Sequence, residues 1–286
     1  YNSNLKSNFV NRLMIHILIP TFNRESKILN ALDSIIIQSY KEWKITIVDN
    51  NSSDNTVEII TKKYKKLINK KIFIKKFKTF VDVETNWNRS LKQVISEKYF
   101  MILCSDDYLH KNFLKIGLKQ LNSKKNLCAY CSAIFYVDLN KKIIKKRSYG
   151  FYGYEVIASF FFRNFIGVPS ALIFRTNDYK KYNFRRNMYY AGDMAFTIKP
   201  YKKNKKITYD KTPLSYYMVH RETLTSEGSG SLKMLFGKYK FRIHVVKHIF
   251  NCSKFFQKLL LVIAKNMLFI ELYFFKLYRF LKCLKK

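Results

Sequence analysis

The chain of 286 residues is long enough to form one large domain, or one domain with a sizeable appendage, without disulfide bonds. It carries 54 Lys and Arg residues against 19 Asp and Glu residues, and this formal charge of +35 indicates anionic partners: nucleic acid, anionic lipid or phosphorylated substrates. Part of the charge is equally explained by the richness in Lys, Asn, Ile, Phe and Tyr that an AT-rich genome produces.

The N-terminus and the cysteines both indicate a cytoplasmic location. Residues 1–12 are polar and lack the apolar core of a signal peptide. The five cysteines are odd in number and scattered through apolar segments, which is typical of reduced thiols. Cys128 and Cys131 form a C-x-x-C pair, but no second pair completes a zinc site, and the apolar run 127–137 around them favours a buried strand.

Up to about residue 125, short apolar runs alternate with segments of helical periodicity. This alternation predicts a Rossmann-like α/β fold, in which a mostly parallel sheet is flanked by helices and binds ligands at the carboxyl ends of its strands. The expected strands are 15–19, 45–48, 72–77 and 99–104, and the expected helices are 26–38, 54–67 with Asp54 as its cap, and 86–95.

Beyond residue 125 the pattern is less regular. We expect strands at 127–137 and 170–174 and a helix that begins near Asp193. The segment 226–231 reads Ser-Glu-Gly-Ser-Gly-Ser, the most flexible composition in the chain, and marks a boundary. The chain is therefore predicted to consist of one domain over 1–231 and a basic, aromatic, helical extension over 232–286.

Two adjacent carboxylates, Asp106 and Asp107, follow the fourth expected strand. Such a pair is repulsive unless a cation or a hydroxyl-rich ligand lies between its members. A Mg²⁺ or Mn²⁺ held by one carboxylate and by the two phosphates of a nucleotide sugar suits this position, because these hard cations take oxygen ligands and few protein carboxylates. The alternative is a turn or helix cap, with Asp107 capping a helix that begins near Lys111.

Further motifs surround this pair in a recognisable order. They read His16-Ile-Leu-Ile-Pro-Thr-Phe-Asn-Arg24, Ile47-Val-Asp-Asn-Asn-Ser-Ser-Asp-Asn-Thr56, Asn86-Trp-Asn-Arg89 and Ser105-Asp-Asp107, followed by Gly192-Asp193-Met-Ala-Phe196 and Tyr216-Tyr-Met-Val-His220. Over roughly residues 13–225 the chain thereby resembles the family 2 glycosyltransferases of GT-A fold, of the type that builds bacterial lipopolysaccharide or capsule. The resemblance implies a nucleoside-diphosphate sugar donor, a Mn²⁺ or Mg²⁺ cofactor, and inversion at the anomeric carbon.

The resemblance also implies roles for residues after the first strand. Pro20, Thr21 and Phe22 match the loop that holds the base, and Phe22 offers an aromatic face on which a pyrimidine stacks. Arg24 lies on the same loop and is expected to meet a phosphate.

After the second and fourth strands, the resemblance implies further donor contacts. Asp49 and Asn50 match the pair that reads the uracil edge and the ribose, Asp106 matches the ribose or sugar contact, and Asp107 matches the metal ligand. Asn50 departs from the commonest pattern, which has Asp there. An amide both donates and accepts, so base recognition is retained while the nucleotide, expected to be UDP, is less firmly fixed.

On the acceptor side, Asp193 matches the catalytic base. Direct displacement at the anomeric carbon needs a carboxylate that takes the proton of the acceptor hydroxyl; the alternative is a cap for a helix over 194–199. His220 matches a closing loop that contacts the metal or the diphosphate, although a lone His is as often structural, and Arg221 is an equally suited phosphate contact. Trp87 and Arg89 match family positions and are expected to pack within their helix.

We therefore predict a metal-dependent, inverting hexosyltransferase that acts on a hydroxyl of a bacterial surface glycan or lipid-linked saccharide. A catalytically inactive relative that serves as a binding protein is the main alternative. A nucleic-acid-binding protein would share the basic, aromatic composition, but no nucleic-acid motif is present and the carboxylate pair opposes it, so we expect no nucleic-acid partner. A nicotinamide-dependent oxidoreductase would need G-x-G-x-x-G after the first strand, where Pro-Thr-Phe-Asn-Arg stands.

The extension is predicted to anchor the chain peripherally on the inner face of the cytoplasmic membrane. Charges interrupt every apolar run, so no stretch approaches the ~20 residues that span a bilayer, and the helix is expected to lie in the interface with its lysines at anionic headgroups. The alternative is a helix packed on the domain with its lysines in water. At ~100° per residue the basic residues share an arc about 60° wide and apolar residues fill much of the remainder: Lys254, Lys258, Lys265, Lys276 and Arg279 against Leu259, Leu260, Ile263, Leu268, Phe269, Ile270 and Phe274.

Overall fold

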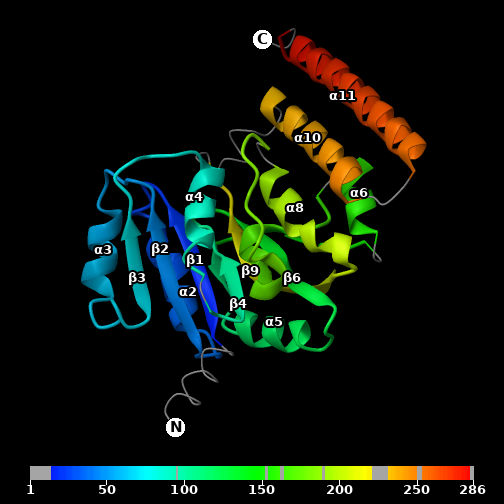
Figure 1. Ribbon diagram of the computed structural model, residues 1–286. Coiled ribbons are helices and arrows are strands. Elements are labelled where there is room, and N and C mark those ends of the chain that lie inside the picture. The colour runs from blue at the N-terminus through cyan, green and yellow to red at the C-terminus, as the bar shows by residue number, and fades with distance from the viewer. Residues whose placement is uncertain are drawn as a thin grey trace.

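The protein forms a curled mixed sheet flanked by helices, with two long helices at its C-terminal end (Figure 1). The computed structural model describes residues 14–94, 96–151, 154–161, 164–188, 191–220, 231–249 and 253–283. The strands are β1 (Ile15–Thr21), β2 (Trp43–Asp49), β3 (Ile72–Lys76), β4 (Tyr99–Ile102), β5 (Tyr108–Leu109), β6 (Leu127–Val137), β7 (Ile143–Arg147), β8 (Leu172–Arg175) and β9 (Lys206–Met218). The helices are α2 (Ile28–Ile36), α3 (Thr56–Lys63), α4 (Val83–Leu91), α5 (Phe113–Leu121), α6 (Glu155–Phe161), α7 (Thr176–Tyr179), α8 (Gly192–Thr197), α10 (Leu232–His248) and α11 (Lys254–Cys283), with short 3₁₀ helices η1 (Pro169–Ala171) and η3 (Lys199–Lys203).

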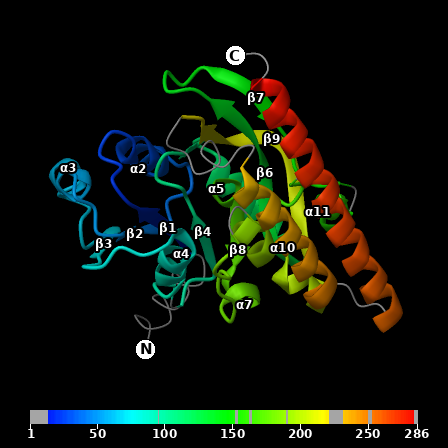
Figure 2. The same ribbon diagram turned by 90° about the horizontal axis from the view of Figure 1, so that it is seen from above.

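The sheet is parallel in its first half and mixed in its second. Its strand order is β3-β2-β1-β4-β8-β6-β9-β5, with β7 paired to β6, and Figure 2 shows β3, β2, β1 and β4 following one another. These four strands pair in parallel, as the sequence predicts. Parallel β1 and β2 end in register at Thr21 and Asp49, so the loops that follow them leave the sheet at the same edge.

Both faces of the sheet are covered, which is why the first strands read as unbroken apolar runs. Alternate residues of β1 enter different cores: Ile17 and Ile19 pack with α2 and α5, whereas Leu18 faces the second half of the sheet and its helices. Buried apolar area of this kind supplies most of the favourable free energy of folding.

Several elements end at other residues than the sequence predicts. Helix α3 ends at Lys63 and not Leu67; its N-cap is Asn55, although the Asp54 carboxylate does accept the Thr56 amide hydrogen at 3.1 Å. Helix α4 starts at Val83 because Asp82 caps it, accepting the Thr85 amide hydrogen at 2.9 Å. Strand β6 has the predicted bounds, while β5, β7 and β9 were not predicted at all.

A buried charge cluster joins the first two strands to the segment before β4. Glu97 is buried and contacts Lys44, and its Oε2 lies 3.6 Å from Nδ1 of His16. Burial opposes ionisation of Glu97, but hydrogen bonds from His16 and Lys44 outweigh it and lower the pKa of the Glu97 carboxyl. His16, the first residue of the first motif, therefore links β1 to the segment before β4.

We expect Glu97→Gln to lower the free energy of unfolding by about 3 kcal/mol, because it leaves the buried cluster without its anion. Thermal unfolding should show a melting temperature lower by roughly 5–10 °C. Asp33→Asn is a matched control, since it removes an exposed ion pair. The side chains of Asp33 and Lys63 are 49% and 43% exposed, so the loss should cost less than about 1 kcal/mol. Equal melting temperatures for Glu97→Gln and the wild type would show that the cluster does not stabilise the sheet.

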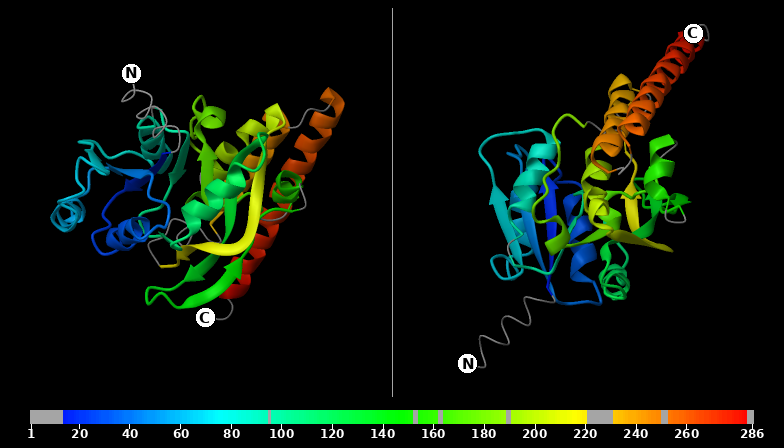
Figure 3. Two further views of the ribbon diagram at one scale, coloured as in Figure 1. Left: turned by 90° about the horizontal axis from the view of Figure 1, so that it is seen from below. Right: turned by 45° about the vertical axis from the view of Figure 1, so that its right-hand side comes forward.

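The C-terminal helices pack on the second half of the molecule. Helix α10 begins after Ser231, whose hydroxyl accepts the Met234 amide hydrogen at 3.3 Å, and packs on α6 and α8. Helix α11 packs on α10, and Figures 1 and 3 show the two side by side, extending beyond the sheet. The buried guanidinium of Arg242 on α10 donates to both carboxylate oxygens of Glu271 on α11, at 3.1 and 2.8 Å. Among the described residues, no helix is long and apolar enough to cross a membrane.

Candidate active site

The loops after β1 and β2 are fastened to each other. The backbone N–H of Asn23 donates to Oγ of Ser52 at 2.9 Å, and the N–H of Ser53 donates back to the Asn23 side chain at 2.9 Å. Asn23 has a left-handed backbone, with φ of 49°, which turns the chain sharply after the strand. The Arg24 N–H donates to Oγ1 of Thr56 at 2.8 Å, so the two loops form one rigid edge.

Asp49 and Asn50 lie at the base of this edge and are both buried. One carboxylate oxygen of Asp49 accepts the Ser52 N–H at 3.1 Å and the other accepts the Ser52 hydroxyl. The Asn50 side chain donates to the carbonyl of Val81 at 2.8 Å and accepts from Arg89 at 3.3 Å. These bonds fix both side chains before any ligand arrives, which favours selective binding.

The residues after β1 provide a hydroxyl, an aromatic face and a cation. Pro20 and Thr21 are buried at the end of β1, and the Thr21 hydroxyl has no hydrogen-bond partner among the described residues. The Phe22 ring is 38% exposed and lies 4.7 Å from the ring of Phe80, centroid to centroid. The Arg24 guanidinium folds back onto its own loop, where it donates to the carbonyl of Asn23 at 3.0 Å.

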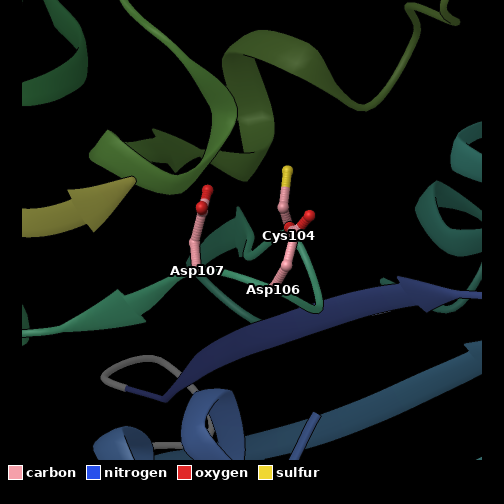
Figure 4. A group of neighbouring side chains, drawn as sticks. All are labelled: Cys104, Asp106 and Asp107. Carbon is pink, nitrogen blue, oxygen red and sulfur yellow. The ribbon is translucent and has the colours of Figure 1, made fainter. Parts of the chain in front are cut away.

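The turn after β4 brings together three side chains that could each bind a metal ion. The Asp107 N–H donates to the Cys104 carbonyl at 3.1 Å and closes the turn. The Cys104 Sγ and one carboxylate oxygen each of Asp106 and Asp107 lie within 4.8 Å of one another. Figure 4 shows all three side chains pointing away from the underlying strand β1.

Within this turn the two carboxylates have different surroundings. The Asp106 side chain is 15% exposed, and its Oδ2 lies 3.0 Å from Nε2 of His220. Asp107 is buried: its Oδ2 accepts the Ser170 hydroxyl at 2.6 Å and its Oδ1 accepts the Met218 N–H at 3.0 Å. Burial, reinforced by the charge of Asp106, raises the pKa of Asp107 well above its usual range. Asp107 therefore caps no helix, because its hydrogen bonds go to β9 and to the segment before β8.

Pairing of β5 with β9 explains why His220 reaches this turn. Tyr108, directly after the carboxylates, is opposite Tyr216, and their rings stack at 4.5 Å. Strand β9 ends at Met218, so His220 lies just past the strand end, next to Asp106.

Asp193 lies in the first turn of α8 and is half-buried. Its carboxylate accepts the Met194 N–H at 2.8 Å, while Ala191 and not Asp193 is the N-cap. Burial raises the pKa of Asp193 to about 6, and the nearby charge of Glu84 acts in the same direction. Burial raises the pKa of the Cys104 thiol, and the charges of Asp107, Asp106 and Asp193 act in the same direction.

The fold thus gathers most of the predicted residues at one edge of the sheet, while Arg221 lies outside the described residues. Three residues of the site were not predicted from the sequence: Cys104, Ser170 and Phe80. Ser170 reaches Asp107 through a contact that only the fold reveals, Cys104 lies beside the carboxylate pair but outside the recognised motif, and Phe80 follows no recognised motif. Arg89 supports Asn50, in addition to packing 4.3 Å over the Phe77 ring.

Fold and site together define an α/β protein whose polar side chains converge at the carboxyl ends of parallel strands, as in nucleotide-binding enzymes. A family model described as glycosyl transferase family 2 matches residues 16–206. The chain therefore belongs to glycosyl transferase family 2.

Curated relatives and solved structures agree with this assignment. An uncharacterized glycosyltransferase of Methanocaldococcus jannaschii is 23% identical over 65% of this chain and 64% of its own length. A poly(ribitol-phosphate) β-glucosyltransferase of Bacillus spizizenii is 26% identical over 73% of this chain, which spans only 33% of that protein. The crystal structure of Staphylococcus aureus TarS 1–349 with UDP-GlcNAc has a TM-score of 0.66 at 19% identity, covering 89% of this chain and 72% of that one. A Pyrobaculum calidifontis mannosyltransferase, in complex with GDP-Man and Mn²⁺, has a TM-score of 0.57 at 14% identity and covers 90% of this chain and 70% of that one.

These likenesses confirm the GT-A fold that the sequence predicts, including helices after the sheet domain.

Proposed function

We propose that this chain transfers a sugar from a UDP-sugar to a hydroxyl group, with inversion, in a reaction that depends on a divalent cation. The observation that carries the proposal is the position of Asp49, Asn50 and Asp106, which follow parallel strands that end at one edge of the sheet. Asp49 and Asn50 are held rigidly where a base and a ribose would lie, next to the exposed ring of Phe22. The unpartnered Thr21 hydroxyl is a further polar group that a bound nucleotide would satisfy.

The side chains after β4 fit a Mn²⁺ or Mg²⁺ ion. Asp106 is the carboxylate that remains partly exposed, and the imidazole of His220 lies beside it, so we propose these two residues as the protein ligands. Asp107, proposed from the sequence as the metal ligand, has both oxygens in hydrogen bonds to Ser170 and Met218, and we propose that it holds the turn in shape. When bound, the cation neutralises charge on the diphosphate leaving group.

Asp193 is the proposed base. A carboxylate whose pKa is raised to about 6 is ionised at neutral pH and yet accepts a proton more readily than an ordinary Asp. It would take the proton of the acceptor hydroxyl as the new bond to the anomeric carbon forms. Glu84 on α4 lies against Gly192, and its negative charge helps to raise the pKa of Asp193. Burial raises the pKa of Glu84 as well.

The acceptor is proposed to carry phosphate groups, as in a polyol-phosphate polymer of the bacterial surface. The Bacillus spizizenii relative is named for transfer to poly(ribitol-phosphate), and the charge of +35 suits a polyanionic acceptor. Two other acceptors are compatible with the same reaction: a lipopolysaccharide or capsule saccharide, and a saccharide linked to a lipid.

The acceptor proposal is tested by incubating the chain with a radiolabelled UDP-sugar and either poly(ribitol phosphate) or an uncharged polysaccharide. We expect label to enter the phosphate polymer, and added salt to lower the rate through a higher KM. Equal labelling of both polymers would refute selection by charge. Labelling of neither, with the donor still bound by the protein, would refute the phosphate polymer as acceptor and leave a lipid-linked acceptor or an inactive binding protein.

We further propose that residues 1–231 form the catalytic domain and that 232–286 attach it to a membrane surface on the cytoplasmic side. Helix α11 contacts α10 through the buried residues Leu260, Ala264 and Leu268. Its opposite face is exposed and almost wholly apolar, and a row of exposed lysines borders that face. The apolar residues are Phe255, Phe256, Leu259, Val262, Phe269, Ile270, Tyr273 and Phe274, and the lysines are Lys254, Lys258, Lys265 and Lys276.

This arrangement combines the two alternatives drawn from the sequence, a helix packed on the domain and a helix at a membrane surface. Helix α11 packs on the protein by one face and leaves another face exposed. A helix with an apolar face bordered by cations is suited to the membrane interface, where the apolar face contacts acyl chains and the lysines contact anionic headgroups. Attachment would confine the enzyme and a lipid-linked acceptor to the same surface.

We expect the double variant Phe269→Asp/Tyr273→Asp to bind vesicles containing phosphatidylglycerol at least about tenfold more weakly than the wild type, because two apolar side chains no longer leave water. Co-sedimentation measures the bound fraction. Ile143→Asp/Ile144→Asp is the matched control: these side chains of β7 are 51% and 55% exposed, comparable to those of α11, and their replacement should not matter. Wild-type binding that is equal on zwitterionic and anionic vesicles would contradict the attachment.

A further inference from the structure

Cys104 places a thiol among the oxygen donors of the turn after β4. Its Sγ and a carboxylate oxygen of each of Asp106 and Asp107 lie within 4.8 Å of one another. In Figure 4 the sulfur points to the same side as both carboxylates. Cys104 is half-buried, whereas Cys128 and Cys131 are buried in the core.

The separations in this group are close to those of one shared cation. A metal–sulfur bond of ~2.3 Å and a metal–oxygen bond of ~2.1 Å put two ligand atoms at most ~4.4 Å apart. The separations between these ligand atoms, up to 4.8 Å, therefore need to shorten only slightly, by small side-chain rotations, for the atoms to share one ion. Asp106 contacts His220 and the Cys104 thiol contacts Ser170, whereas Asp107 accepts hydrogen bonds on both of its carboxylate oxygens, so the adjustment falls to Cys104 and Asp106.

We propose that Cys104 binds the same divalent cation as Asp106, so that the site selects a transition-metal cation over Mg²⁺. This inference rests on the proposed cation-dependent binding of the donor. Mg²⁺ is held by oxygen ligands, whereas thiolate beside imidazole or carboxylate suits softer ions such as Co²⁺ and Zn²⁺, and Mn²⁺ tolerates it better than Mg²⁺ does. As the sulfur–metal bond forms, the thiol gives its proton to solvent.

Cobalt(II) provides a spectroscopic test that does not depend on catalysis. We expect titration of Co²⁺ into the full chain with UDP, under anaerobic conditions, to produce a sulfur-to-metal charge-transfer band in the near ultraviolet that saturates at one ion per chain. Cys104→Ser should abolish the band, while the matched control Cys252→Ser/Cys283→Ser should keep it. In the wild type, Mn²⁺ with UDP should protect Cys104 from iodoacetamide, which mass spectrometry reads without any mutation.

A second variant tests the selectivity itself. Calorimetric titration of UDP in Mn²⁺ and in Mg²⁺ gives the ratio of the two affinities, and Cys104→Asp is expected to shift that ratio towards Mg²⁺ by about tenfold or more. If UDP binds together with either cation, but Co²⁺ gives no charge-transfer band, Mn²⁺ does not protect Cys104 and the ratio of affinities is unchanged, the thiol is not a ligand, although cation-dependent donor binding stands. If UDP binding is independent of every cation, the inference fails together with the proposed metal dependence.

Discussion

Asp106→Asn is expected to abolish sugar transfer and cation-dependent binding of UDP, while the melting temperature stays within about 2 °C of the wild type. The variant removes the carboxylate charge that remains partly exposed at the end of β4 and lies 3.0 Å from His220. An amide oxygen is a poor substitute, because divalent cations bind at such sites mainly through anionic oxygen. Titration of Mn²⁺ by electron paramagnetic resonance, with and without UDP, measures the loss.

Asp107→Asn is the informative comparison. Asp107 accepts hydrogen bonds on both oxygens, and an amide group offers only one acceptor to Ser170 and Met218, so this variant should lose roughly 1–3 kcal/mol of stability. Loss of transfer in Asp107→Asn would thus accompany a lower melting temperature. If Asp107→Asn instead lost cation binding at unchanged stability while Asp106→Asn retained it, the metal ligand would be Asp107, as the sequence alone suggests.

Asp193→Asn is expected to lower turnover by roughly 10²–10⁴-fold and to leave the affinity for UDP-sugar nearly unchanged. The reason is that Asp193 lies on α8, apart from the residues that are proposed to hold the nucleotide, and would act only as the acceptor is deprotonated. Glu84→Gln is a suitable control, because it removes a neighbouring carboxylate without removing the base. A fall of less than tenfold, or a parallel loss of donor affinity, would make Asp193 a structural or donor-binding residue.

The pH dependence of turnover gives an independent check on the same residue. A base works only when deprotonated, so turnover should fall as the pH drops below about 6, the raised pKa of Asp193. In the Asp193→Asn variant this acidic limb should vanish from the residual activity. Persistence of the limb in that variant would assign it to another group.

The first half of the fold is readable from the sequence because its interactions are local in pattern. The strands from β1 to β4 are buried on both faces and appear as apolar runs, and the crossover helices between them are amphipathic. The second half resists prediction because its strands pair out of chain order. Strand β9 lies between β6 and β5, and β5 is only two residues long, too short for any periodicity.

The same distinction applies to the candidate site. Motifs just after strands, such as Asp49 with Asn50, were predicted because parallel strands end at a common edge. The bond between Asp106 and His220 joins positions 114 residues apart. The resemblance to a known family suggested only that His220 meets the metal or the diphosphate. The different environments of Asp106 and Asp107 could not be predicted, since they depend on Ser170 and on the end of β9.

The most direct test of the account is hydrolysis of nucleotide sugars in the absence of an acceptor. The chain is incubated with UDP-GlcNAc, UDP-glucose, UDP-galactose or GDP-mannose and with Mn²⁺, Mg²⁺ or chelator, and the released nucleoside diphosphate is quantified. We expect slow release from a UDP-sugar with Mn²⁺, loss of release with chelator, and none from the Asp106→Asn variant. Release that is equal with chelator, or binding of no nucleotide sugar under any condition, would contradict a cation-dependent glycosyltransferase.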